Sequence, residues 1–253
     1  MRYIATADSD IGISKSTNQD GVLIKHAATD IGEVLMAIVC DGMGGLAKGE
    51  LASATVIRKF ARWFDEELPF ELMNLDMQVI GGKWSLMLKD LNLKIQQYGA
   101  EHGVSLGTTF SGILFVGNQY VIAHVGDTRV YQIGASLNQI TTDQTFIARE
   151  ISRGTMTAEQ AKTDKRRNLL LQCVGASKTV EPQVICGKTE KGAYMLCSDG
   201  FRHEITDAEI YEAFKPVNIM NKNAMHNNAR YLIEKVKSRN EKDNISVVLI
   251  KAE

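Results

Sequence analysis

Short apolar runs rich in valine and isoleucine recur along the chain, and glycine, asparagine or aspartate bounds most of them. Runs of this length and composition predict β-strands. The pair Gly117-Asn118 separates two of these runs, which predicts a tight antiparallel hairpin. Nine strands are expected, at Arg2–Ala7, Gly21–His26, Val34–Cys40, Thr109–Val116, Gln119–Val125, Arg129–Ile133, Gln183–Cys186, Tyr194–Cys197 and Ile245–Lys251.

Apolar residues at helical spacing predict four helices, which lie in pairs between groups of strands. The third of them begins at a capping-box pattern, Thr206 to Glu209, and ends at Pro216. Helices grouped in this way predict an α+β fold in which helices cover the outsides of two sheets. The apolar residues that predict the other three helices are Ala52, Val56, Phe60, Trp63 and Phe64; Trp84, Leu88, Leu91, Ile95 and Tyr98; and Ala229, Leu232, Ile233 and Val236.

Composition favours one soluble folding unit. The chain has 253 residues, 44% of them hydrophobic, and only three prolines, so one large core is feasible and no linker divides it. Basic and acidic residues nearly cancel, with a net charge of −1, which gives no reason to expect nucleic acid or a membrane as partner. The N-terminus lacks a signal-peptide pattern, and the longest apolar run, Val34–Cys40, is too short to span a membrane. We therefore expect a cytoplasmic protein.

Four cysteines lie far apart inside apolar runs, without the paired spacing of a zinc or redox motif. Buried, reduced and structural thiols are expected at these positions. They are Cys40, Cys173, Cys186 and Cys197.

Aspartates at strand ends are the informative chemical feature. Asp41, Asp127 and Asp199 follow apolar strands, whereas Asp20 and Asp243 directly precede them. Each aspartate alone is consistent with an ordinary turn, because Asp-Gly and Gly-Asp are common turn dipeptides. The segment after Asp41 leads into a helix and is richer in glycine than a turn requires, which suggests backbone held close to a ligand. Its glycines are Gly42, Gly44, Gly45 and Gly49.

If these strand ends meet at one rim, the carboxylates cannot all stay ionised without a counter-charge. The available ligands are almost all oxygen, with no pair of histidines at ligand spacing, which favours Mg²⁺ or Mn²⁺ over zinc. Two ions suit this number of carboxylates. Such a pair activates water and neutralises phosphoryl oxygens, so the pattern predicts hydrolytic phosphate chemistry.

Six ordered motifs spread over essentially the whole chain resemble those of the metal-dependent protein phosphatases of type 2C, in a bacterial form. One such motif is weak evidence, whereas six in the family's order make chance similarity very unlikely. The motifs are Gly12 to Asp20 (GISKSTNQD), Asp41-Gly42-Met43-Gly44-Gly45 with Gly49-Glu50, Gly107-Thr108-Thr109, Val125-Gly126-Asp127-Thr128-Arg129, Cys197-Ser198-Asp199-Gly200 and Asp243-Asn244-Ile245-Ser246-Val247.

The resemblance implies a single domain over residues 1–253, built as a four-layer αββα sandwich of two antiparallel sheets with a cleft at one end. It implies a flap at about residues 145–170, which selects the substrate and includes a capping box from Thr157 to Gln160. It also implies a phosphoprotein substrate, a cognate serine/threonine kinase and a monomeric chain.

By position in the motifs, Asp41 would bridge two Mn²⁺ or Mg²⁺ ions. Asp20 and the Gly42 carbonyl would serve one ion, Asp199 and Asp243 the other, and Asp127 a weaker third ion. A bridging hydroxide would attack phosphoserine or phosphothreonine directly, without a covalent phosphoenzyme. The resemblance thus implies that Asp41, Asp20 and Asp199 are catalytic.

Three positions depart from the family pattern. Lys15 stands where the family usually has an arginine that grips the phosphate, so it either binds phosphate as a point charge, which makes it a fourth catalytic residue, or is a solvated loop lysine. Met43 replaces a histidine proposed in some relatives as general acid, and Gln19 replaces a frequent glutamate.

Other polar residues receive more ordinary interpretations. His124 is expected in the core and Arg129 in an ion pair with a nearby acid, whereas His203 is a candidate for the cleft wall.

Two other functions compete with the phosphatase. A pseudophosphatase that binds a phosphorylated partner or regulates a kinase is supported only by Lys15, and the retained acids argue against it. A two-metal nuclease would share the acids but needs a basic groove, and the sequence offers only the cluster Lys165-Arg166-Arg167.

Overall fold

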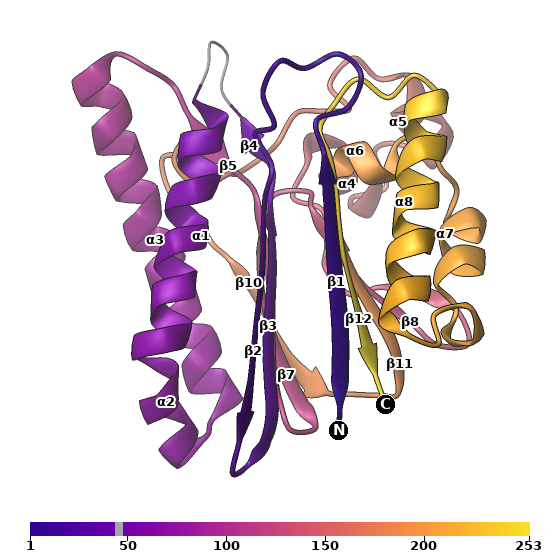
Figure 1. Ribbon diagram of the computed structural model, residues 1–253. Coiled ribbons are helices and arrows are strands. Elements are labelled where there is room, and N and C mark those ends of the chain that lie inside the picture. Colours follow the sequence, from indigo (N-terminus) through magenta and orange to yellow (C-terminus); the bar gives the residue numbers. More distant parts are fainter. Residues whose placement is uncertain (44–47) are drawn as a thin grey trace.

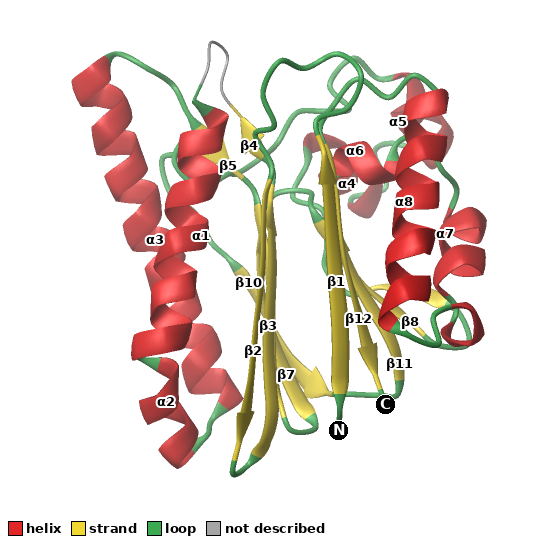
Figure 2. Cartoon of the chain, in the orientation of Figure 1, coloured by secondary structure: helices red, strands yellow, loops and turns green. Residues whose placement is uncertain are grey.

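Two five-stranded antiparallel sheets pack face to face, and helices cover the outer face of each (Figures 1 and 2). The structure is a computed structural model, and it describes residues 1–43 and 48–253. The predicted α+β, four-layer sandwich of two antiparallel sheets flanked by helices is confirmed. Gly44, Gly45 and Leu46 of the glycine-rich motif lie outside the described residues.

The first sheet joins the two ends of the chain. The strand nearest the N-terminus, Tyr3–Asp10, pairs with the strand nearest the C-terminus, Ile245–Ala252, so that Tyr3 lies opposite Ala252 and Asp10 opposite Ile245. Both termini therefore lie at one end of the sandwich (Figure 1). In spatial order its strands are β1 (Tyr3–Asp10), β12 (Ile245–Ala252), β11 (Gly192–Cys197), β8 (Arg129–Ile133) and β9 (Leu137–Gln139).

The second sheet is built mainly from hairpins. The turn at Gly117-Asn118 places Val116 opposite Gln119, and Gly117 takes a positive φ of 59°, as the predicted tight turn requires. In spatial order its strands are β10 (Gln183–Lys188), β7 (Gln119–Val125), β6 (Phe110–Val116), β3 (Gly32–Cys40) and β2 (Gly21–Thr29). Two short strands, β4 (Gly42–Met43) and β5 (Gly107–Thr108), pair beside it.

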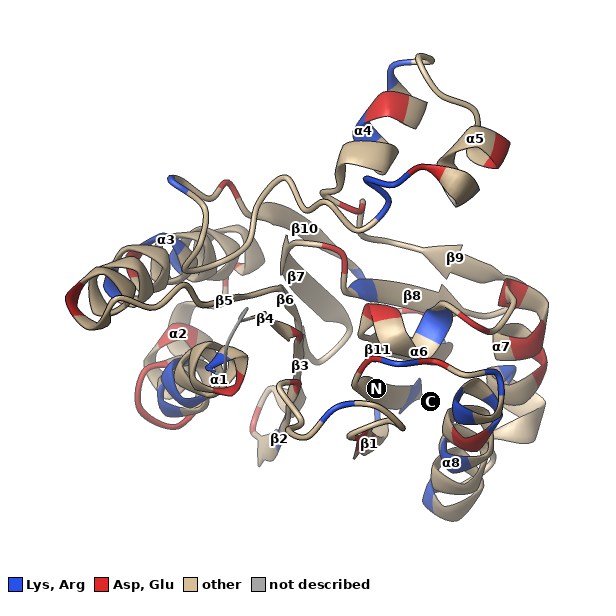
Figure 3. Cartoon of the chain, turned by 90° about the horizontal axis from the view of Figure 1, so that it is seen from above, with Lys and Arg blue, Asp and Glu red and all other residues tan. Residues whose placement is uncertain are grey.

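Each sheet has its own helical layer. Helices α1 (Gly49–Glu66) and α3 (Met77–His102) pack on the second sheet, and α2 (Leu68–Glu71) and η1 (Leu72–Asn74) join them. Helices α6 (Asp199–Arg202), α7 (Asp207–Phe214) and α8 (Lys222–Ser238) pack on the first sheet, with η2 (Pro216–Asn218) between the last two. Helices α4 (Phe146–Ser152) and α5 (Ala158–Thr163) stand apart from both layers (Figure 3).

Three hydrophobic layers result, one between the sheets and one under each helical layer. The helical stripes predicted from the sequence supply the outer layers. Trp63 and Trp84 are fully buried and meet edge to face at 5.5 Å between ring centroids, and Phe60 lies 4.6 Å from Phe110. Such aromatic contacts add to the burial of apolar surface.

The predicted strands agree with the observed ones to within a few residues. Three short strands were not predicted, namely β4, β5 and β9. Each has two or three residues, too few to show an alternating pattern. The predicted segment at residues 145–170 contains α4 and α5, and the capping box at Thr157 is present. The boundaries of a single domain and of a flap stay predictions.

None of the helices in the described part of the chain is both long enough and apolar enough to cross a membrane. Cys40, Cys173 and Cys197 are buried free thiols, as predicted, whereas Cys186 is only partly buried.

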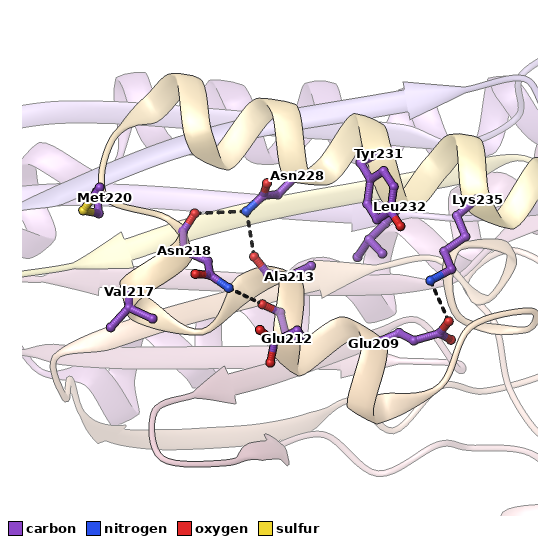
Figure 4. A pocket seen from close by; sticks show the side chains of 10 residues that line it. All are labelled: Glu209, Glu212, Ala213, Val217, Asn218, Met220, Asn228, Tyr231, Leu232 and Lys235. Atoms are coloured by element: carbon purple, nitrogen blue, oxygen red, sulfur yellow. Dashed lines mark hydrogen bonds and ion pairs between the residues drawn. The ribbon is translucent and has the colours of Figure 1, made fainter.

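Helices α7 and α8 are joined by side-chain hydrogen bonds around a groove of about 520 Å³ (Figure 4). The Asn228 amide donates to the Ala213 carbonyl at 2.8 Å and to the Asn218 carbonyl at 3.0 Å. Lys235 and Glu209 form an ion pair at 2.7 Å across the same groove. Asn228 thus satisfies a carbonyl group in the last turn of α7 and another at the end of η2.

Replacing Asn228 with alanine removes both donors, so we expect the variant to lose about 1–2 kcal/mol of the free energy of unfolding. Urea unfolding followed by circular dichroism measures the loss. Asn227→Ala is the matched control, because Asn227 is exposed on the same helix. Equal stability of the two variants would contradict the role given to Asn228.

Candidate active site

All five candidate aspartates lie at the same end of the two sheets. Asp20 directly precedes β2 and Asp41 directly follows β3, and these strands are antiparallel partners, with Gly21 opposite Cys40. Asp199 and Asp243 are brought together in the same way. Asp199 follows β11 and Asp243 precedes β12, and these strands are antiparallel partners, with Cys197 opposite Val247. Asp127 follows β7. Figure 3 looks down on this end of the molecule.

The backbone of Asp41 is held from both sides by the Gly-Thr-Thr motif. Its N–H donates to the Thr109 hydroxyl at 2.9 Å, and its carbonyl accepts from the Thr109 N–H at 2.9 Å and from the Thr108 hydroxyl at 3.0 Å. Both threonines are buried. The motif therefore fixes the backbone position from which the Asp41 side chain extends.

Asn244 ties the N-terminal loop to the last motif. Its side-chain oxygen accepts from the Gln19 N–H at 2.9 Å, and its amide nitrogen donates to the Ile11 carbonyl at 2.9 Å. Asn244 is 3% exposed. Since Asp20 and Asp243 each directly neighbour one of these residues, the bonds hold the two carboxylates near each other.

Asp199 is placed by a reciprocal pair of bonds between neighbouring strands. The Ser198 N–H donates to the Ser246 carbonyl at 3.0 Å, and the Ser246 N–H donates to the Ser198 hydroxyl at 3.0 Å. A Cβ atom at Gly200 would stand 2.2 Å from the Asn244 carbonyl oxygen. Only glycine at this position lets the two motif segments approach so closely.

Gly42 and Gly49, like Gly200, allow backbone segments to approach closely, here on the other side of the cluster. A Cβ atom on Gly42 would lie 2.4 Å from the Gln19 and Gly49 carbonyl oxygens. The described glycines of the motif therefore bring loops together, which is a simpler reason for their presence than contact with a ligand.

The cluster is electrostatically costly as it stands. Burial, together with the charges of Asp199 and Asp20, raises the pKa of Asp41 well above its usual range. Burial also raises the pKa of Asp20 to about 7, to which Asp199 and Asp243 contribute, although the Ser198 and Ser246 hydroxyls oppose it. Mutual shifts of this kind show that the carboxylates share one region.

Buried oxygens without partners mark where a cation fits. Within residues 1–43 and 48–253, neither carboxylate oxygen of Asp20 accepts a hydrogen bond of good geometry, and Oδ1 of Asp199 accepts none. Carboxylate oxygens that are buried, acidic and unpartnered suit a hard divalent cation. The residue types of the cluster therefore fit Mg²⁺ or Mn²⁺.

Several of these carboxylates face cationic side chains of the chain itself. Lys15 Nζ lies 2.8 Å from Asp243 Oδ1, and this contact raises the pKa of Lys15 although partial burial opposes it. His203 Nε2 lies 3.5 Å from Asp199 Oδ2, and its Nδ1 lies 3.3 Å from Glu241 Oε2. In the described residues, no group of three His, Cys, Asp or Glu side chains is already arranged to hold an ion, which is consistent with these internal pairings.

A cleft of about 820 Å³ extends from this cluster to the segment that contains α4 and α5. Lys15, Asp127, His203 and Asp243 line one side of it. The other side is formed by Ile147, Ala148, Ile151, Ala158, Ala161, Arg167 and Asn168. With divalent cations on its acidic side, a cleft of this size has room for a phosphorylated side chain and its neighbours.

The more ordinary sequence interpretations hold. His124 is fully buried and hydrogen-bonded to the Ser111 hydroxyl at 2.9 Å, and burial lowers its pKa to about 4. Arg129 pairs with an acid, Asp143, at 2.6 Å. His203 lies in the cleft wall.

Five further charged residues of the cleft were missed from the sequence, namely Asp143, Arg202, Glu204, Glu241 and Lys242. Arg202 lies one helical turn after Asp199 in α6, and this i to i+3 spacing is a signal that could have identified it. Asp143 and Glu241 lie in loops with no motif around them.

Comparison with known proteins agrees with this geometry. Residues 13–232 match the Protein phosphatase 2C family, and the chain belongs to that family. Serine/threonine protein phosphatase PstP of Mycobacterium tuberculosis is 32% identical over 252 residues, which is 98% of this chain and 44% of PstP. The chain thus spans less than half the length of that relative. The resemblance inferred from the motifs is confirmed.

Solved structures of the family have the same fold. Serine/threonine phosphatase Stp1 from Staphylococcus aureus superposes with a TM-score of 0.85 at 27% identity, covering all of this chain and 96% of Stp1. The catalytic domain of PstP in complex with two manganese ions gives a TM-score of 0.77 at 29% identity, covering 98% and 97% of the two chains.

The acidic cluster predicts how the stability of the metal-free protein depends on pH. A folded-state pKa of about 7 for Asp20 exceeds its usual value of about 4, so its protonated form contributes stability that is lost as pH rises through 7. We expect a lower Tm at pH 8 than at pH 5.5 in EDTA, and each kcal/mol corresponds to about 2–4 °C for a chain of this size.

Asp20→Asn is the control for this experiment, because its amide is neutral at both pH values. The variant should show a smaller loss of Tm between pH 5.5 and 8, and Mn²⁺ should raise its Tm less than that of the wild type. Equal pH dependence in the two proteins would contradict the electrostatic account.

Proposed function

We propose that this chain is a metal-dependent phosphatase that hydrolyses phosphoserine and phosphothreonine in proteins. The observation that carries the proposal is the group of buried carboxylates, with unpartnered oxygens on Asp20 and Asp199. The group lies beside a cleft of about 820 Å³ that Asp127 and Asp243 of the same cluster line. Relatives named serine/threonine phosphatases support the substrate class.

Asp20, Asp41, Asp199 and Asp243 would hold two divalent cations, with the Gly42 carbonyl as a further ligand. The manganese ions in PstP support Mn²⁺ as one suitable ion, and oxygen ligands also suit Mg²⁺. When bound, such cations lower the pKa of water and neutralise the oxygens of the phosphoryl group. The chain's own residues then supply position and charge.

Lys15 would bind the substrate phosphate. Its ammonium now lies against Asp243, and a cation bound to the same carboxylate would compete with it and free it for an incoming phosphate. A lysine contacts phosphate as a point charge and lacks the two-pronged geometry of arginine. Phosphate would therefore be oriented less firmly than by an arginine at this position.

The two sides of the cleft would contact different parts of the substrate. The acidic floor would hold the reacting group, while the segment around α4 and α5 would contact the polypeptide on either side of the phosphorylated residue. A phosphorylated protein and its cognate serine/threonine kinase are the partners that we propose. A monomeric chain and a cytoplasmic location also stay predictions.

Asp199→Asn tests the proposed activity. Loss of one carboxylate ligand should lower kcat/KM on a phosphothreonine peptide by more than about 100-fold, since even indirect contacts to a metal change its affinity by about 10–100-fold. Hydrolysis by the wild type should need Mn²⁺ or Mg²⁺ and stop in EDTA. Absence of turnover with any ion, in folded protein, would contradict the proposal.

Lys15 variants test the phosphate contact. Removing a charge-assisted bond costs about 1.5–3 kcal/mol, so Lys15→Ala should lower kcat/KM by about 10–100-fold, mainly through KM. Lys15→Arg should lower KM relative to the wild type, because a guanidinium can make two parallel bonds to phosphate. An unchanged KM in both variants would show that Lys15 does not bind the substrate.

A further inference from the structure

The Asp127 side of the cleft differs from the rest of the acidic cluster because two arginines lie in it. Asp127 is 8% exposed, and its backbone loop is fixed by Gln144, which accepts from the Gly126 N–H at 2.8 Å. Charged groups that act on Asp127 include Asp41, Asp143, Asp199, Arg202 and His203. We call Asp127, Asp143, Arg129 and Arg202 the arginine corner.

Asp143 is already neutralised by Arg129. The guanidinium donates to both carboxylate oxygens, from Nε at 2.8 Å and from Nη2 at 2.6 Å, and a third donor, Gln139, lies at 2.9 Å. Two parallel bonds of this kind are strong and specific in geometry. Although burial opposes it, the contact lowers the pKa of Asp143, so this carboxylate stays ionised and satisfied.

Arg202 lies among the remaining oxygens of the corner. Its Nη2 donates to the Asp127 carbonyl at 3.2 Å, and it lies 3.6 Å from Asp127 Oδ2 and 3.7 Å from Asp143 Oδ2. The Arg202 side chain is 14% exposed. One guanidinium nitrogen thus contacts two carboxylates and a carbonyl, which is the type of oxygen set that a divalent cation prefers.

We infer that Arg202 is a built-in counter-ion of Asp127 that replaces a third divalent cation, so that the cleft takes two ions and not three. The inference rests on the proposed function only in assuming that the cleft binds metal. It revises the expectation from the sequence that Asp127 holds a weaker third ion.

Formal charge supports this division of the cleft. In the arginine corner, two guanidinium groups balance the formal charges of Asp127 and Asp143. An added divalent cation would therefore meet less uncompensated negative charge there than in the rest of the cluster, although the nearby Asp199 carboxylate also acts on Asp127. In the rest of the cluster, the ion pairs among the described residues give Asp20, Asp41, Asp199 and Asp243 just two cationic partners, Lys15 on Asp243 and His203 on Asp199. Cations are therefore favoured on that side and disfavoured beside Arg202.

The position of Arg202 in α6 ties its backbone to that of Asp199. Asp199 and Arg202 lie on the same short helix, and the segment around Asp199 is fixed by the close approach of Gly200 to Asn244. The guanidinium therefore cannot leave the corner by a movement of a separate loop. Unlike an ion, it cannot be removed by a chelator.

Isothermal titration with Mn²⁺ counts the ions directly. We expect two Mn²⁺ per chain in the wild type and a third, weaker site in Arg202→Ser, at an affinity at least about tenfold higher than any third site in the wild type. Arg202→Lys keeps the charge and should still bind two. Arg62→Ser, which removes an exposed arginine on α1, is the control for a general change in charge.

The double variant Arg202→Ser/Asp127→Asn should return to two ions, which assigns the extra site to Asp127. Asp127→Asn in the otherwise native chain should leave two ions bound, and this measurement tests the inference even where Arg202→Ser does not fold. Three ions in the wild type, one of them lost in Asp127→Asn, would overturn the inference, as would two ions in folded Arg202→Ser.

Failure of the proposed function gives a different result. Two bound ions without hydrolysis of a phosphothreonine peptide would contradict the phosphatase activity and leave the role of Arg202 intact. Hydrolysis of the peptide with three bound ions would support the phosphatase activity and contradict the role of Arg202.

Discussion

Repulsion among buried carboxylates is the constraint on which the rest of the structure depends. Folding brings Asp20, Asp41, Asp127, Asp199 and Asp243 to one end of two sheets, and burial raises the pKa of several of them. Such an arrangement costs free energy unless cations offset it. The surrounding motifs supply the rigidity that keeps it in place. The side chains of Thr108, Thr109, Ser198 and Asn244 bond to the backbone beside the aspartates. Among the described residues, both carboxylate oxygens of Asp20 and one of Asp199 are left without a partner.

The chain offsets this charge unevenly. Beside Asp127, Arg129 is fixed by bonds to both oxygens of Asp143, and Arg202 donates to the Asp127 carbonyl. Beside Asp243 and Asp199, the partners are Lys15 and His203, whose side chains are more exposed than those of the two arginines, so that an incoming cation or phosphate can displace them. The arrangement beside Asp127 favours a rigid wall of the cleft, whereas the arrangement beside Asp199 and Asp243 favours a site that can bind ligands. Glycine at positions 42, 49 and 200 permits the close packing of loops that both arrangements require.

The sequence predicted the fold and the location of the acids well, because both leave local signals. Strands such as β3 and β8 show apolar runs, and an aspartate directly after such a run is conspicuous. Apart from Arg202, which lies one helical turn after Asp199, and the expectation that Arg129 pairs with some acid, the partners of the charged residues at the site could not be predicted. Asp143 reaches Arg129 and Glu241 reaches His203 across loops that have no pattern of their own, and Lys15 meets Asp243 from the other end of the chain. Short β9 was missed for a related reason, since three residues carry no periodicity.

The central claim is that the carboxylates of Asp20, Asp41, Asp199 and Asp243 form a two-cation site whose neighbour, the arginine corner, excludes a third. A crystal structure of the protein grown with Mn²⁺, with anomalous diffraction measured at the manganese edge, tests it most directly. The account predicts two anomalous peaks among those four carboxylates and none beside Asp127. A cleft without peaks in the presence of Mn²⁺, or a peak between Asp127 and Asp143 with Arg202 displaced, would contradict it.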